Sequence, residues 1–304
     1  MTKLYYPAPV FSTTFNTTIA GNFPATFDAY LYRSLNNDDQ LKLTIELRLK
    51  LVPAPPGPLH PLLPDANGRF FSTVPWKPAD WPNFVANAQS QANMWNNKFW
   101  LIPPPNFSAF DVKFGTFPNQ AFRPNVRCEL LVDFAPSKKP HNEIKVANLN
   151  LQLLAGLPLN SRTFRSHYLL YDLLDQVPWV NPTPAPGEPS TQQTIAHEIG
   201  HALGLDHIGI LRRTRLCEFA MIFEDNLKNG DWKLTGGSNS WFCYGHEQGI
   251  ALSGNIMGGG DAFSIENARP WVWAANMMSQ NNFGPSGWRA VMGDPGTGNW
   301  VQLY

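Results

Sequence analysis

The sequence of 304 residues predicts an α+β fold, and three observations indicate it. Apolar and polar side chains alternate over 41–51, which is the period of a half-buried β-strand. From residue 80 the apolar side chains recur every three or four positions, as in an amphipathic helix. Further strand-like segments follow, and then a second helical segment at 190–204. Strand, long helix, several strands and helix is an α+β order and not a regular βα alternation.

The composition excludes two classes of partner. Lys and Arg total 23, Asp and Glu total 23, and the net charge is zero. A general nucleic-acid binder, or a protein bound to anionic membranes, needs an excess of basic residues. Charged residues make up only 15% of the chain and prolines number 28, so we expect a loop-rich globular protein with a neutral polar surface.

The sequence leaves the localisation open. No apolar run approaches the roughly 18 residues of a transmembrane segment. Residues 1–10 lack the continuous apolar region of a signal peptide. Cytoplasmic synthesis, export without such a signal and a mature chain are all compatible with this pattern.

The first part of the chain predicts one strand and one long helix. Residues 1–40 indicate only short strands and loops, and the proline-rich segment 52–79 indicates an extended loop that covers a surface. Asp80 is a candidate N-cap for a helix over 80–99, which the prolines at 103–105 end. The apolar stripe of this helix predicts core packing and not a ligand surface; it consists of Trp81, Phe84, Val85, Ala88, Ala92, Trp95 and Phe99.

Four strand candidates follow that helix, at 110–114, 126–134, 142–154 and 167–174. Cys128 lies on the apolar face of the second, which predicts a packing residue and not a reactive thiol. The apolar phase changes near Ala147, which predicts a bulge. His141 and His167 have no partner at ligand spacing, so we expect hydrogen-bonded or exposed side chains. Residues 178–189, rich in proline, predict a surface loop.

The residues that carry chemistry lie in one short segment. His197, Glu198 and His201 form H-E-x-x-H, which Gly204 and His207 extend to H-E-x-x-H-x-x-G-x-x-H. On a helix the first two histidines lie one turn apart on one face and can reach the same zinc ion. Glycine at the C′ position lets the helix stop and the chain turn back, so His207 arrives from outside it. Three neutral imidazoles leave one zinc position for water, which Glu198 can reach without binding the metal.

The helix that carries this motif has its own signals. Ser190 and Gln193 have capping-box spacing, which predicts a helix over 190–204. The face opposite the histidines is apolar and is expected to pack into the core; it contains Ile195, Ile199, Ala202 and Leu203.

The extended motif is that of the metzincin zinc metalloproteases, and its wording resembles that of the matrix metalloproteases. The resemblance implies a twisted mixed five-stranded sheet with two long helices above a cleft. It also implies a smaller, loop-rich C-terminal subdomain with one helix below, dividing the chain into 1–207 and 208–304. The strand at 142–154 would be the edge that pairs with an extended substrate.

Metzincins also carry a methionine turn beneath the metal, and two methionines have suitable wording. Met257 is preferred because a helix over about 268–279 can follow it; Met292 is the alternative. In either place the methionine is expected to pack under the histidines without binding zinc. The matrix metalloproteases place this turn soon after the third histidine, whereas residues 208–254 intervene here as an insertion, which indicates a divergent metzincin.

Two features of that insertion remain open. Cys217 and Cys243 are either a disulfide or two partly buried thiols. Gly258 follows Met257, so the tyrosine that some metzincins carry beyond the methionine turn is absent; Tyr244 is a candidate substitute, but nothing in the sequence places it. His246 has no second histidine four residues later and forms no second zinc motif.

The predicted function is that of a monomeric zinc-dependent endopeptidase acting on a protein or peptide, with no nucleic-acid or membrane partner. His197, His201 and His207 would hold one Zn²⁺, and Glu198 would be the general base. A zinc hydrolase of a non-peptide amide is one alternative, and a non-catalytic binding module that keeps the fold is another. We expect no propeptide before the predicted domain, which would suit an exported effector or a very selective enzyme.

Overall fold

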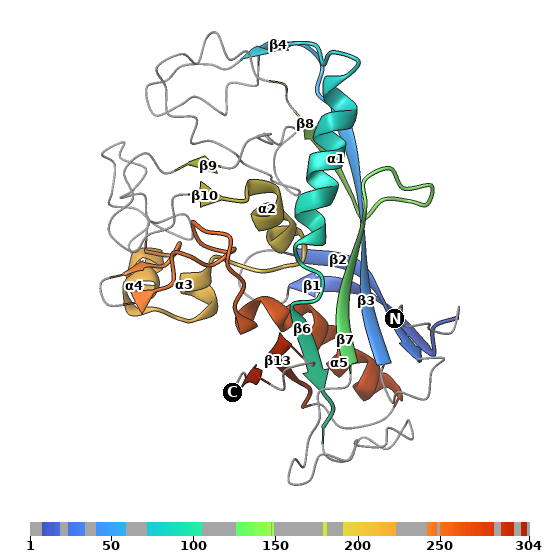
Figure 1. The fold of residues 1–304 in the computed structure, drawn as a ribbon, viewed down its shortest axis with the longest axis vertical. Helices are drawn as coiled ribbons and strands as arrows, with labels where there is room; N and C mark the ends of the chain where they lie inside the picture. Colours follow the sequence, from blue (N-terminus) through green and yellow to red (C-terminus); the bar gives the residue numbers. More distant parts are fainter. Residues whose placement is uncertain are drawn as a thin grey trace.

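The computed structural model describes residues 8–18, 24–33, 41–58, 72–104, 126–146, 148, 179–180, 191–222, 242–247, 250–282, 287–294 and 299–302. These residues form an α+β fold, as predicted, built on one large mixed sheet (Figure 1). Several predicted features lie outside the described residues: the strands at 110–114 and 167–174, residues 149–154 with Ala147, and the side chains of His167 and Ser190.

The sheet contains eight strands, seven of them in the order β1-β2-β3-β7-β6-β13-β14. The eighth, β8, pairs with the second half of β3, beyond the residues of β3 that pair with β2. β7 and β8 run parallel to β3, and all other pairs are antiparallel. The strands are β1 (Phe11–Thr18), β2 (Pro24–Arg33), β3 (Leu41–Pro53), β6 (Phe99–Ile102), β7 (Val126–Asp133), β8 (Asn142–Val146), β13 (Arg289–Asp294) and β14 (Asn299–Gln302).

The expected five-stranded sheet is therefore wrong. The short strand β6 and the C-terminal hairpin β13–β14 were not predicted. In residues 1–40 only short strands and loops were expected, whereas β1 and β2 form a hairpin of strands with 8 and 10 residues. The hairpin β1–β2 contains many Thr, Phe and Tyr residues, which favour strands, but few aliphatic side chains. Its core face includes Phe15 and Phe27, whose rings are stacked at 4.8 Å. The twelve residues after Met292 are rich in glycine, a weak strand signal, yet Asp294 and Asn299 form the last pair of the C-terminal hairpin.

β3 is the predicted strand at 41–51, confirmed and extended to Pro53. Its odd-numbered residues from Leu41 to Leu51 are buried, because that face meets the helices. On the other face, Arg48 pairs with Asp28, and its backbone N–H donates to Nδ1 of His141 at 3.0 Å. The expectation of a hydrogen-bonded His141 is thus confirmed. β7 confirms the strand at 126–134, and Cys128 is buried on its core face as predicted.

The helices are α1 (Asp80–Asn93), α2 (Thr194–Ala202), α3 (Ile208–Leu211), α4 (Arg215–Ile222) and α5 (Arg269–Asn282), which follows a 3-10 turn over Ile265–Ala268. α1, α2 and α5 pack on one face of the sheet and share its apolar core (Figure 1). The helix expected at about 268–279 is confirmed by α5. Within the described residues no helix is both long and apolar enough to span a membrane.

The helix expected at 80–99 is too long. α1 ends at Asn93, and the chain then turns through Asn97, which has a φ of 62°, before β6 begins at Phe99. Trp95 and Phe99 continue the apolar period of the helix and are buried in the same core, although they lie beyond its last residue. The prediction therefore extended the helix too far. Asp80 is the first residue of the helix, and the N-cap is Ala79.

Short strand pairs lie within the predicted loop 52–79 and across the ends of the predicted loop 178–189. β4 (Gly57–Pro58) pairs with β5 (Ser72–Thr73), and β9 (Trp179–Val180) pairs with β10 (Thr191–Gln192). A third small pair joins β11 (His246–Glu247) to β12 (Ile250–Ala251). The chain just after β5 binds the end of β8, since the Trp76 indole donates to the Val146 carbonyl at 3.3 Å.

Candidate metal centre

The helix α2 is held at its start by α1. The side chain of Gln91 is buried, and its Oε1 accepts hydrogen bonds from the backbone N–H groups of Ile195 at 3.0 Å and Ala196 at 3.3 Å. These are two of the N–H groups that a helix start leaves without an internal partner. The Trp95 indole also donates to the Ala196 carbonyl at 3.1 Å.

The predicted capping box is therefore replaced by a cap from another helix. α2 begins at Thr194, and its N-cap residue Gln193 makes no side-chain cap. A glutamine 104 residues away accepts hydrogen bonds from the start of the helix, the role expected of a local capping box. The helix expected at 190–204 is correspondingly shorter at both ends.

The end of α2 confirms the conformation expected of Gly204. Its φ is 84°, in the left-handed region that favours glycine. The Leu205 N–H donates to the Gly200 carbonyl and the Gly204 N–H to the His201 carbonyl, both at 2.9 Å. This pair of bonds is the Schellman pattern, which ends a helix and reverses the chain. It brings residues 205–207 back along the face of α2 that carries the histidines.

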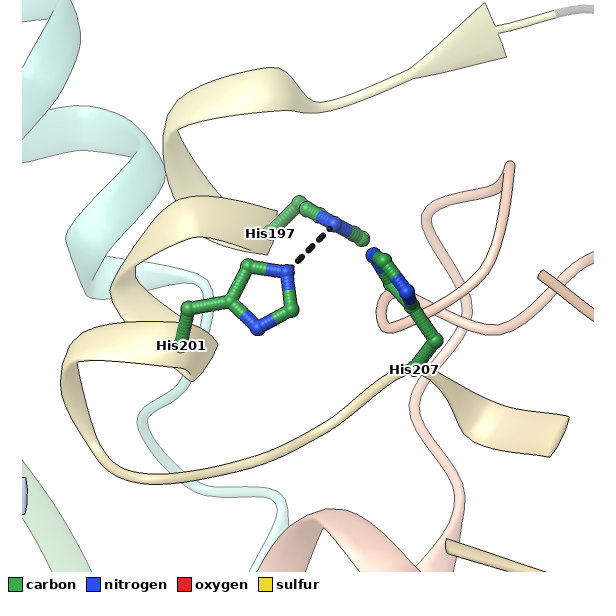
Figure 2. A group of neighbouring side chains, drawn as sticks. All are labelled: His197, His201 and His207. Atoms are coloured by element: carbon green, nitrogen blue, oxygen red, sulfur yellow. Dashed lines mark hydrogen bonds between the residues drawn. The ribbon is translucent and has the colours of Figure 1, made fainter. Parts of the chain in front are cut away.

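The structure brings the three predicted histidines together. One ligand nitrogen from each of His197, His201 and His207 lies within 4.8 Å of the other two. Figure 2 shows the three rings converging, two from α2 and one from the chain that follows it. His197 and His207 are buried and His201 is partly buried. The three residues can hold a metal ion.

Backbone carbonyls orient the two helical histidines. Nδ1 of His197 lies 2.6 Å from the Ile256 carbonyl oxygen, and Nδ1 of His201 lies 2.7 Å from the Leu205 carbonyl oxygen. A carbonyl can only accept, so each Nδ1 carries the proton and each Nε2 of the neutral ring presents a lone pair. The Schellman turn thus also delivers the carbonyl that orients His201.

The two Nε2 atoms face one another at 3.1 Å (Figure 2). This contact is a hydrogen bond only if one ring carries a second proton; with both rings neutral, two lone pairs point at the same space. Burial and the neighbouring His201 lower the pKa of His197 to about 3, against the opposing effect of the bond to Ile256. His197 is therefore neutral at ordinary pH, in the form that binds metals.

Glu198 lies on α2 beside His197 and is buried, with 7% of its surface exposed. Its carboxylate belongs to the same helix as two of the clustered histidines.

Cys128, the other buried group singled out in the sequence, is not part of the histidine cluster. Burial raises the pKa of its thiol well above the usual value. A thiol held neutral in this way is inert.

Met257 packs directly against α2 at Gly200, which lies between His197 and His201 in the sequence. A Cβ at Gly200 would overlap with Sδ of Met257 and lie 3.2 Å from Cζ2 of Trp95. Met257 is fully buried, and its carbonyl accepts from the Ile208 N–H at 2.9 Å, next to His207. Met292 lies in β13 of the sheet.

The turn around Met257 is built on a buried amide. Oδ1 of Asn255 accepts from the Met257 N–H at 2.8 Å, and Nδ2 donates to Oγ of Ser264 at 2.7 Å and to Oδ1 of Asn267 at 3.1 Å. Ser264 in turn donates to Glu266, which forms a two-pronged ion pair with Arg212. Because Arg212 follows α3, this network joins the turn under His197 to the chain after His207.

The structure resolves the two open features of the insertion. Cys217 and Cys243 form a disulfide. Tyr244, the next residue, lies against the histidines: its ring centroid is 3.9 Å from that of His207 and 5.9 Å from that of His197. Residues 223–241, between the two cysteines, are outside the described part of the chain.

Sequence reasoning missed Gln91 and Asn255, and it named Tyr244 without placing it at the metal centre. Gln91 was hidden because it is a polar residue on an apolar helix stripe, and that position is the only signal it gives. Asn255 stands two residues before Met257, a spacing typical of an Asx turn. Tyr244 would have followed from the disulfide, which ties its neighbour Cys243 to α4.

Within the described ranges, His197, His201 and His207 form the one group of metal-ligating side chains. No family model, curated protein or solved structure matches this chain, so its function is inferred from the residues of this centre alone.

Proposed function

We propose that the protein is a zinc-dependent endopeptidase, in which His197, His201 and His207 hold the metal and Glu198 is the general base. The observation that carries the proposal is the convergence of imidazole nitrogens within 4.8 Å beside a buried glutamate. Two neutral rings with lone pairs 3.1 Å apart repel one another unless a cation or a proton lies between them.

The donor set suits zinc. Nitrogens that share a tetrahedral zinc at roughly 2.0–2.1 Å are separated by about 3.3 Å. The His197–His201 pair is close to this spacing, at 3.1 Å, and the ligand nitrogen of His207 lies within 4.8 Å of both. Three imidazoles and an adjacent carboxylate resemble catalytic zinc sites, which keep one position open.

The chain's own residues supply the proton transfers. Bound zinc would polarise a scissile carbonyl and acidify water. Glu198 would take the proton from the attacking water and then deliver it to the leaving amine, a transfer worth roughly 10²–10⁴ in rate. The peptide bond as substrate is supported by the resemblance of 197–207 to the metzincin motif.

The proposal is tested by Glu198→Gln, which removes the base and keeps the shape of the side chain. Wild-type protein loaded with zinc should cleave an unfolded protein or a peptide library at defined bonds. The variant should bind zinc as the wild type does, with kcat/KM lower by roughly 100-fold or more. Mass spectrometry of the products and metal analysis of both proteins give the two readouts.

Glu218→Gln is the matched control, because Glu218 is an exposed glutamate on the nearby α4. It should cleave at the wild-type rate. Equal cleavage by Glu198→Gln and the wild type, or zinc-loaded wild type inert toward every peptide, would contradict the proposal. Glu198-dependent hydrolysis of a non-peptide amide by a peptide-inert wild type would replace the endopeptidase with that alternative.

A further inference from the structure

The ring of Tyr244 is part of the metal centre's wall. Its centroid lies 3.9 Å from that of His207, with the planes 31° apart. It is also parallel to the His197 ring, at 5° and 5.9 Å. Tyr244 therefore contacts one histidine closely and faces a second. Unlike the histidines, it comes from the segment 242–247, which lies far along the chain from α2.

Several backbone contacts hold this segment in place. The Gly209 N–H, at the start of α3, donates to the Cys243 carbonyl at 2.8 Å, and a Cβ at Gly209 would lie 2.8 Å from Cα of Cys243. On the other side, a Cβ at Gly258 would lie 2.6 Å from the Tyr244 carbonyl oxygen. The segment is thus packed between the chain after His207 and the turn of Met257, with glycine at both contacts.

The Cys217–Cys243 disulfide adds a covalent tie at the residue before Tyr244. Cys217 lies in α4 and is fully buried, as is Cys243. α4 follows α3, which begins directly after His207. The disulfide therefore connects the tyrosine to the same stretch of chain that carries the third histidine.

We propose that Tyr244 is a positioning residue for His207 and that the Cys217–Cys243 disulfide keeps it there. The inference rests on the proposed zinc site and deepens it. His207 lies beyond the end of α2, at the N-cap of α3, so its position is not fixed by the helix that carries His197 and His201. A ring packed against the imidazole restricts its rotation, and residues that orient metal ligands contribute strongly to metal affinity. Loss of the disulfide is then expected to weaken the site.

The experiment measures zinc affinity, by competition with a chromophoric chelator, and the visible absorption spectrum of the Co²⁺-loaded protein. Tyr244→Ala should weaken zinc binding by about 10-fold or more and alter the Co²⁺ spectrum. Tyr244→Phe keeps the ring and should stay within about 2-fold of the wild type, because the proposed restraint is the ring packed against the imidazole. Tyr32→Ala is the control and should match the wild type, because Tyr32 is a partly buried tyrosine on the sheet face that carries Lys42, opposite the helices.

The disulfide is tested with Cys217→Ser and Cys243→Ser together, since thiol reductants themselves bind zinc. This double variant should weaken zinc binding, and adding Tyr244→Ala to it should cause little further loss. Non-additive effects are expected when two changes act through one contact. Circular dichroism and thermal unfolding of the metal-free proteins establish that each variant is folded.

Wild-type zinc affinity and Co²⁺ spectrum in folded Tyr244→Ala would overturn the role of the tyrosine, and additive losses would overturn its link to the disulfide. Both results leave the endopeptidase proposal standing. Conversely, the affinity pattern above in a protein that cleaves no peptide supports the positioning role and refutes the peptidase. A wild type that binds neither zinc nor cobalt overturns both.

Discussion

At the scale of single residues, two glycines shape the centre. Gly204 ends α2 in the left-handed region, so that His207 can return to the histidine face. Gly200 has a different function: it leaves room for the Met257 side chain to lie against the helix. Neither role depends on chemistry with the metal, and each follows from the absence of a Cβ. The sequence indicated the first, because a C′ glycine is a local signal; the second needs a partner 57 positions away and is visible only in the fold.

Gly200→Ala should therefore destabilise the protein. The added Cβ overlaps with Sδ of Met257, and Cε lies 3.1 Å away, so the methionine must move from the helix. Overpacking of this kind typically costs about 1–3 kcal/mol. Chemical denaturation of the metal-free protein measures the loss. Gly254→Ala is the control, because a Cβ there meets nothing within 4 Å. A variant at 200 as stable as the control would show that the methionine does not fill this space in solution.

At the scale of elements, α2 is held by chain segments distant in sequence. α1 caps its start through Gln91, and the turn at 255–257 accepts from His197 through the Ile256 carbonyl. That turn is joined to the end of α3 by the ion pair of Glu266 with Arg212. The helix itself was predictable from its period, whereas its start at Thr194 was not, because the groups that cap it are tertiary neighbours.

The Glu266–Arg212 pair predicts a pH dependence. Burial raises the pKa of Glu266, but hydrogen bonds from Arg212 and Ser264 outweigh it, so the pKa lies below its usual value of 4.5. A carboxylate with a lowered pKa contributes stability that is present above the unfolded-state pKa and is lost as pH falls through the folded-state pKa. Glu266→Gln should thus be less stable than the wild type at neutral pH, with the difference shrinking below about pH 4.5.

Urea denaturation at several pH values, with a chelator present, tests this expectation. Glu143→Gln removes an exposed carboxylate, paired with Lys50 at 2.9 Å, and should change the unfolding free energy little at any pH. A Glu266→Gln deficit that stays constant from pH 7 to pH 3, or grows on acidification, would be inconsistent with a lowered pKa for Glu266.

At the scale of the whole molecule, the candidate metal ligands draw several parts of the fold together. Two ligands come from α2, the third precedes α3, and their supports lie in α1, the turn of Met257 and the disulfide-tied segment. A ligand that binds only the folded state stabilises it by mass action. The three histidines meet only in the fold, so metal binding and folding should be coupled.

Zinc removal should accordingly lower the stability of the whole chain. At free zinc 100-fold above its dissociation constant, the unfolding free energy should exceed that of the chelated protein by about 2.7 kcal/mol. His207→Ala should lose most of this difference. Magnesium should give little stabilisation, because it prefers oxygen ligands to imidazole. Denaturation curves measured with zinc, with magnesium and with chelator test this expectation. Equal unfolding free energies under the three conditions would mean that the histidines hold no zinc.

The sequence by itself determined the features that depend on neighbouring residues. The strand at 41–51, the apolar stripe of α1, the left-handed turn at Gly204 and the histidine spacing on α2 all follow from local periodicity or from one residue's conformational range. The number of strands, the Gln91 cap, the packing of Met257 on Gly200 and the disulfide that places Tyr244 were decided by the tertiary structure. Each of these joins residues far apart in the chain, and burial in a shared core, which local pattern does not encode, brings them into contact.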